Sequence, residues 1–174
     1  MTEKIWVLLT EDPNVNGTGQ NEVPGALTID STVITVHPDR DAVLAHICAT
    51  YDPKGRCAEL GSGSLQNSLQ GSGYEFEYHE IAVAAIGDTV WLLVVGDPHN
   101  VVGARLDEVP GALTLPSCDV VTAHADFDAL VEHLRRTYDP DGAYADEGSG
   151  ALHNYLRQDS YRIASAELPL QSGK

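Results

Sequence analysis

The sequence predicts an α+β protein made by tandem duplication of one β-β-α-(short α)-β module, with the two copies packed about a pseudo-twofold axis. The main observation is an internal sequence repeat. Val-Pro-Gly-Ala-Leu-Thr at residues 23–28 recurs at 109–114, and Thr-Tyr-Asp-Pro at 50–53 recurs at 137–140. Because matched positions lie 85 to 87 residues apart, from Trp6 with Trp91 onward, length changes are confined to loops. We expect a first repeat at residues 1–86 and a second at 87–174.

Each copy begins with an uninterrupted apolar run, at residues 5–9 and 90–95. A run without alternation of polar and apolar residues indicates a strand that is buried on both faces. An Asp-Pro step then ends the strand, at Asp12 and at Asp97, and the Pro-Gly of the repeated block is a turn signal. A second β segment follows in each copy, at residues 32–36 and 120–123.

The clearest helix of each copy comes next. Asp39 and Asp126 stand where an N-cap carboxylate accepts from free backbone N–H groups. An apolar stripe is expected along each helix, at Leu44, Ile47 and Tyr51 and at Val131, Leu134 and Tyr138. Tyr-Asp-Pro ends both helices, because proline disfavours helical geometry in the residue before it.

The last part of each copy is a glycine-rich connection, a short helix and a strand. The short helices are expected on Leu65 with Leu69 and on Leu152 with Leu156. In residues 74–78, aromatic residues alternate with glutamates, which predicts an aromatic face toward the core and a carboxylate face toward solvent.

The net charge of the chain limits the kinds of partner that it can bind. The chain has 26 acidic and 10 basic residues and a formal net charge of −16. The excess is shared, because residues 1–86 hold 12 acids and 4 bases while residues 87–174 hold 14 and 6. Direct nucleic-acid binding is disfavoured, since phosphate contacts need clustered cations and Arg135-Arg136 is the one adjacent basic pair. A basic protein partner or a small molecule is compatible with this charge.

Cysteine usage and the apolar runs favour a cytoplasmic protein. Cys48, Cys57 and Cys118 are odd in number and have no CxxC spacing, so neither a disulfide framework nor a zinc ribbon is expected. No signal-peptide pattern is visible, and every apolar run is too short to cross a bilayer. We expect no cofactor and no metal.

The first candidate site is the Gly-Ser-Gly loop before each short helix, centred on Ser62 and Ser149. Backbone N–H groups in such a loop can hold a phosphate or carboxylate. The alternative is that the serines only cap the helices. Glu59 and Glu147 beside the loops favour the capping role, because they would repel an anion.

The second candidate is a histidine pair in each copy, His37 with His46 and His124 with His133. Neutral imidazole is a good metal ligand and titrates near physiological pH. The spacing predicts that the two rings do not meet as i, i+4 ligands do, which argues against a metal site. The alternative is a set of hydrogen-bonded core histidines.

The third candidate is the loop at residues 11–17, which has oxygen donors spaced almost as in a calcium loop. The twelfth-position carboxylate is displaced by one residue, and strands replace the usual helices. A solvated hairpin loop is the better interpretation.

The recurring polar residues are mostly of cap, turn and helix-ending types, which favours a binding or interaction protein over an enzyme. One version is an acidic inhibitor, or a nucleic-acid-mimicking decoy, for a basic partner. The other is a small-ligand binder with polar contacts from His37, His124, Tyr51 and Tyr138 at the cleft between the repeats. An enzyme would use the same cleft with one histidine as general base.

Overall fold

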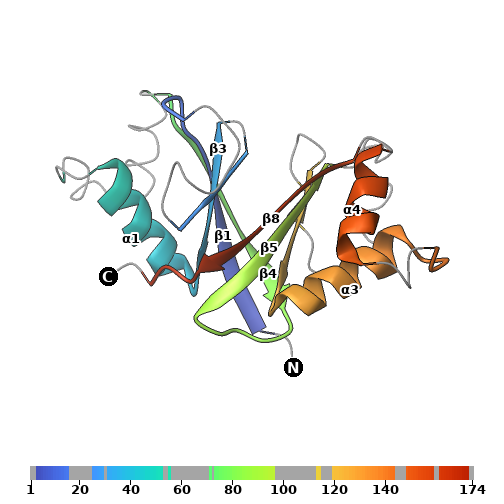
Figure 1. The fold of residues 1–174 in the computed structure, drawn as a ribbon. Helices are drawn as coiled ribbons and strands as arrows, with labels where there is room; N and C mark the ends of the chain where they lie inside the picture. Colours follow the sequence, from blue (N-terminus) through green and yellow to red (C-terminus); the bar gives the residue numbers. More distant parts are fainter. Residues whose placement is uncertain are drawn as a thin grey trace. The chain divides into compact units, whose positions relative to one another are not determined.

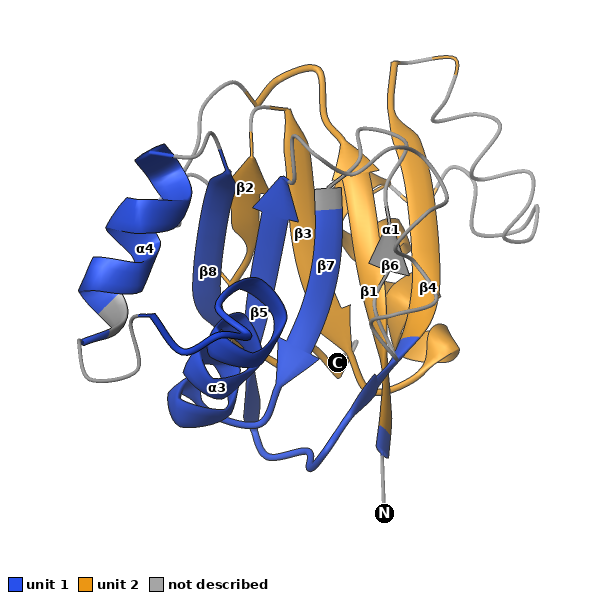
Figure 2. Cartoon of the chain, turned by 90° about the vertical axis from the view of Figure 1, so that its right-hand side faces the viewer, with its two compact units in different colours: residues 1–3, 81–167 blue, residues 4–80, 168–174 orange. Residues whose placement is uncertain are grey.

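The computed structural model describes residues 3–15, 25–29, 31–52, 55, 71, 73–96, 113–114, 119–143, 148–158 and 161–172. Within these ranges the chain is α+β, with two four-stranded antiparallel sheets and three helices (Figure 1). The chain divides into two compact units (Figure 2). Unit 1 comprises Met1–Glu3 and Ile81–Glu167, and unit 2 comprises Lys4–Glu80 and Leu168–Lys174.

The sheet of unit 2 has the strand order β2-β3-β1-β4. Its strands are β1 (Glu3–Glu11), β2 (Leu27–Ile29), β3 (Thr32–His37) and β4 (Glu75–Val83). β1 and β3 are antiparallel, with Trp6 opposite His37. β4 also runs antiparallel to β1, because Lys4 contacts Glu80 while Trp6 contacts Tyr78. The central strands β3 and β1 thus carry the apolar residues that the sequence indicated.

The sheet of unit 1 has the order β6-β7-β5-β8. Its strands are β5 (Thr89–Gly96), β6 (Leu113–Thr114), β7 (Asp119–His124) and β8 (Arg162–Pro169). β5 and β7 are antiparallel, with Trp91 opposite His124. In each unit, therefore, the strand that precedes the long helix ends with a histidine opposite a tryptophan.

The helices start and stop where the sequence predicts. They are α1 (Arg40–Tyr51), α3 (Phe127–Tyr138) and α4 (Ser149–Gln158). The Asp39 carboxylate accepts from Ala42 N at 2.8 Å, and Asp126 accepts from Ala129 N at the same distance. Both aspartates are therefore confirmed as N-caps. The tyrosine of each Tyr-Asp-Pro is confirmed as the last helical residue.

The expected helical stripe is wrong at its first position. In α1 the fully buried residues that pack on β1 are Val43 and Ile47, whereas Leu44 is only half-buried. In α3 the corresponding residue is Leu130 in place of Val131. Spacings of three and four residues both stay on one helical face, so the sequence allowed either neighbour. The angle at which the helix lies on the sheet decides between them.

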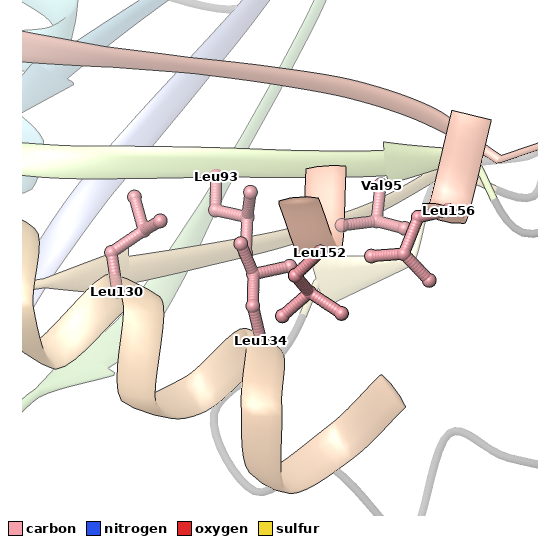
Figure 3. Close-up of a cluster of buried hydrophobic side chains, with 6 residues drawn as sticks. All are labelled: Leu93, Val95, Leu130, Leu134, Leu152 and Leu156. Atoms are coloured by element: carbon pink, nitrogen blue, oxygen red, sulfur yellow. The ribbon is translucent and has the colours of Figure 1, made fainter. Parts of the chain in front are cut away.

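Each unit has a core between its sheet and its helices. In unit 2 the core residues Leu8, Val43 and Ile47 are surrounded by half-buried aromatic side chains, including the predicted row Tyr74, Phe76 and Tyr78. In unit 1 the core is aliphatic (Figure 3), and its residues are Leu93, Val95, Leu130, Leu134, Leu152 and Leu156. The short helix expected on Leu152 and Leu156 is confirmed as α4.

The first strands, β1 and β5, are buried on both faces, as predicted. Val7 and Leu8 point to opposite faces of their sheet and are 0% and 1% exposed, and Leu92 and Leu93 are both fully buried. Cys48 is a half-buried cysteine. None of the three described helices has the length and apolar character that a membrane crossing needs.

Several predicted features lie outside the described residues, namely the short helix on Leu65 and Leu69, the Asp97-Pro98 step, Ser62, Cys57 and Cys118. The repeat boundary between residues 86 and 87 stays a prediction. The chain passes from unit 2 to unit 1 after Glu80 and from unit 1 to unit 2 after Glu167. These two positions are 87 residues apart. The first lies within β4 and the second within β8, so each of these strands has residues in both units.

Candidate functional site

A pair of touching histidines lies at the end of β3 in unit 2. His37 is the last residue of β3, and His46 lies in the second turn of α1. Their ring centroids are 4.9 Å apart. The two histidines are not spaced as i, i+4 ligands, but their rings meet, because α1 begins three residues after β3 ends and folds back against that strand.

Hydrogen bonds fix the tautomer of His37, which is 0% exposed. Its Nδ1 lies 3.0 Å from the main-chain oxygen of Gln171, and its Nε2 lies 2.8 Å from Thr35 Oγ1. A carbonyl oxygen only accepts, so Nδ1 carries the proton. In the neutral ring Nε2 then accepts from the Thr35 hydroxyl, and both ring nitrogens are satisfied.

Burial keeps this pair neutral at pH 7. Burial, followed by the neighbouring His46, lowers the pKa of His37 to about 4, against smaller opposing effects of the Gln171 carbonyl and Asp39. Burial also lowers the pKa of His46, and a hydrogen bond from its ring to the Gln171 side chain opposes that shift. The pair is therefore a hydrogen-bond donor and acceptor group without charge.

Unit 1 contains a second pair with the same internal geometry. The ring centroids of His124 and His133 are also 4.9 Å apart, and Thr122 Oγ1 lies 2.8 Å from His124 Nε2. Burial, then His133 and Arg136, lowers the pKa of His124 to about 4, and Asp126 opposes this. Burial and Arg136 lower the pKa of His133. This pair is also neutral at pH 7, but an arginine stands beside it.

The two predicted tyrosines have different surroundings. The Tyr51 ring lies edge-on to His46, with centroids 6.5 Å apart, and it also contacts Tyr74 and Phe76. Burial raises the pKa of Tyr51, although its side chain also hydrogen bonds Thr10. Tyr51 therefore joins the histidine pair to the core of unit 2.

Tyr138 belongs to the core of unit 1. Its ring packs against the aliphatic cluster and lies 5.5 Å from the Tyr161 ring, measured between centroids. The role of Tyr138 as a ligand contact stays a prediction.

The remaining candidates contribute little to a site. Ser149 is the first residue of α4, and anion binding at its loop stays a prediction. In the calcium-like loop the Asp12 carboxylate accepts from Asn14 N at 2.9 Å, while Glu11 accepts from the hydroxyls of Ser31 and Thr32. No group of three or more His, Cys, Asp or Glu side chains suited to a metal ion occurs in the described part of the chain.

Two site residues were missed by the sequence reasoning, Gln171 and Arg136. Neither recurs in the other copy, so the repeat gave no signal for them. The threonines were detectable, because Thr-x-His recurs at residues 35–37 and 122–124. On a strand, residues two apart share a face, which places the hydroxyl beside the imidazole.

The candidate site is thus a neutral, hydrogen-bonded histidine pair that occurs once in each α+β unit. Comparison of the chain with protein-family models, with curated proteins and with solved structures finds no match.

The depressed histidine pKa values predict acid sensitivity. The pKa values of His37 and His124 fall from 6.5 to about 4 on folding. Between these values the unfolded chain binds protons that the folded chain excludes, so stability is full above pH 6.5 and falls as the pH drops toward 4. Urea unfolding at several pH values should show this slope in the wild-type chain.

The window from pH 6.5 to about 5 is diagnostic, because most carboxylates titrate below it. His37→Gln with His124→Gln should flatten the slope there, and His79→Gln, on a half-buried residue of β4, is the histidine control. A wild-type stability that is constant across this window, or an unchanged slope in the double variant, would contradict the prediction.

Proposed function

We propose that the chain is a non-catalytic binding protein that engages a basic partner protein through exposed carboxylates, as an inhibitor or a nucleic-acid-mimicking decoy. The observation that carries this proposal is the exposure of two glutamates on β4, a strand at an edge of the described sheet of unit 2. Its Phe76 and Tyr78 pack on the core, while Glu75 and Glu77 are exposed. Neither glutamate forms an ion pair with a lysine or arginine of the described residues.

Glu77 lies 3.7 Å from the ring nitrogen of His79, and carboxylates on a strand without a lysine or arginine partner suit recognition of a cationic surface. They also discourage pairing of this edge with other strands, which is a common role of charged edge residues. The net charge of −16 extends the same sign over the whole chain. Such a field raises association rates with a basic partner and makes binding sensitive to salt.

We also propose that the chain arose by tandem duplication, so that a partner meets two acidic copies. The support is the shared strand order and the tryptophan opposite histidine in both units. The equal charge of the two halves supports it as well. Pseudo-twofold packing of the copies stays a prediction.

A pull-down from the source cell tests the acidic-surface proposal. The immobilised chain should capture a basic protein at low salt and release it as the salt concentration rises. Glu75→Gln with Glu77→Gln should weaken capture more than the matched pair Asp128→Asn with Glu132→Gln, which removes the same charge from exposed positions of α3. Capture that does not depend on salt, or equal losses in both variants, would count against β4 as the recognition surface.

Small-ligand binding is the second candidate function, with an enzyme that uses one histidine as general base as a variant of it. It is favoured by the contact of His37 with His46 and of His124 with His133. The proposed ligand contacts are His37, His124, Tyr51 and Tyr138, and a cleft between the repeats stays a prediction.

A further inference from the structure

The two histidine pairs share one internal geometry, so any difference between them must come from their surroundings. His124 and His133 each lie 87 residues after their counterparts His37 and His46. Both ring contacts measure 4.9 Å, and both threonine contacts measure 2.8 Å. Each pair can therefore present the same nitrogens to a third group.

In unit 2 the third group is Gln171. Its main-chain oxygen accepts from His37 Nδ1, and its side chain hydrogen bonds His46. The side-chain nitrogen donates to the Gly25 carbonyl at 3.1 Å, which leaves the amide oxygen to accept from His46. His37 and His46 thus each donate a ring N–H to an oxygen of Gln171.

In unit 1 the corresponding residue is Ala84, which lies 87 positions before Gln171. The chain joins unit 1 at Ile81 and unit 2 at Leu168, so Ala84 and Gln171 follow these junctions at equal distance. The alanine side chain has no oxygen to offer. Within the described residues, no group accepts from His124 Nδ1, and His124 is partly exposed while His37 is fully buried.

Arg136 adds a positive charge to the second pair. It is exposed on α3 and influences both His124 and His133, whereas the corresponding residue of α1 is Ala49. The negative group that faces His124 is Asp126, whose carboxylate is engaged as the N-cap of α3. His124 and His133 do not have the oxygen acceptors that Gln171 gives to the other pair, so their ring donors can bind the oxygens of an oxyanion. The nearby guanidinium of Arg136 matches the negative charge of such a ligand.

We propose that His124, His133 and Arg136 bind a small oxyanion, a carboxylate or a phosphate, whose oxygens take the role that Gln171 has in the other unit. This inference rests on the second candidate function, small-ligand binding, and is independent of the acidic β4 surface. The His37 pair does not bind such a ligand, because Gln171 already occupies its donors.

Histidine side-chain NMR at pH 7.5 provides the test, with titrations of inorganic phosphate and of acetate at constant ionic strength against chloride. The expected result is a saturable shift of the His124 and His133 nitrogens and no shift at His37 and His46. A response to phosphate alone assigns a phosphate ligand, and a response to acetate alone assigns a carboxylate. No saturable response to either anion, or equal responses of both pairs, would overturn the proposal.

Two variants test the assignment of residues. Arg136→Ala, which copies Ala49 of unit 2 at an exposed position, should weaken binding about 10-fold or more, the usual range for a charge-assisted contact. Ala84→Gln, which restores the residue found at position 171, should weaken binding strongly, because its side chain would add the amide oxygen that Gln171 offers to His46. Unchanged affinity in both variants would refute the site. Because neither variant alters β4, capture of a basic partner should persist in both, which separates this test from that of the acidic surface.

Discussion

Replacing Leu134 by alanine should lower the free energy of unfolding by about 3 to 4 kcal/mol, since a buried leucine leaves a cavity as well as losing its burial. Leu134 is 0% exposed and lies on α3 between the sheet and α4. It packs in the six-residue aliphatic cluster, where Leu93 and Leu152 surround it (Figure 3). Side chains from three elements meet there, so the cavity cannot close by moving one of them.

Leu44→Ala is the matched control, because it makes the same chemical change on α1 at a half-buried position. It should cost about 1 kcal/mol, in proportion to the smaller area that it buries. Urea unfolding followed by fluorescence measures both losses, with Trp91 reporting on unit 1 and Trp6 on unit 2. Equal losses for the two variants would show that the stripe expected from the sequence, and not the observed one, faces the core.

Local chemistry explains why much of the fold was predictable. The caps at Asp39 and Asp126 depend on hydrogen bonds to residues three positions away, and the helix ends depend on the proline that follows. The apolar runs of β1 and β5 need no knowledge of the partner strands. Each of these signals is contained in fewer than about ten residues, and it appears twice in the chain.

The unpredicted features all depend on distant residues. Contact between His37 and His46 depends on the direction in which α1 leaves β3, which the spacing does not encode. The site residue Gln171 lies 134 positions from His37 and is not repeated. The strand β2 has three residues, too few to show a period, and it is defined by its pairing with β3.

Gly25 takes part both in a local turn and in a contact with residues far away in the sequence. The repeated Pro-Gly predicted a turn, and Gly25 has a φ of +73°, a conformation that favours glycine. A β-carbon at this position would also lie 3.0 Å from the Gln171 side-chain nitrogen and 3.3 Å from Pro169. The glycine therefore serves both the turn and the close approach of the C-terminal segment, and only the first was readable from the sequence.

Deleting residues 168–174 should destabilise unit 2 by about 4 kcal/mol or more, although most of that unit lies over 80 residues earlier in the chain. Leu168 is 2% exposed, and loss of a buried leucine side chain costs about 2 kcal/mol. Gln171 N donates to Val36 O at 2.9 Å, and a parallel bridge joins Leu170 to Val36. Each lost hydrogen bond adds about 1 kcal/mol, and leaving His37 Nδ1 buried without an acceptor adds about 1 to 3.

Unfolding of the deletion variant should be measured in a Trp91→Phe background, so that Trp6 alone reports on unit 2. Removal of only Gly173 and Lys174 is the control and should change little. Gln171→Ala should fall between the two, because it keeps the main-chain bonds to Val36 and His37 but loses the side-chain bonds to Gly25 and His46. If the Trp6 transition of the deletion variant matches that of the control, the segment does not stabilise unit 2.

A peptide with the sequence of residues 166–174 should rescue the deletion variant in trans, because the contacts of Leu170 and Gln171 with unit 2 are noncovalent. Binding to the folded state raises the melting temperature in proportion to ln(1 + [L]/Kd), so the rise should increase steadily with peptide concentration. The same peptide with alanine in place of its glutamine should act only at higher concentration, since the bonds to Gly25 and His46 are missing. Rescue of equal strength by both peptides would assign the stabilisation to Leu168 and the main chain, and would remove the Gln171 side chain from the histidine site.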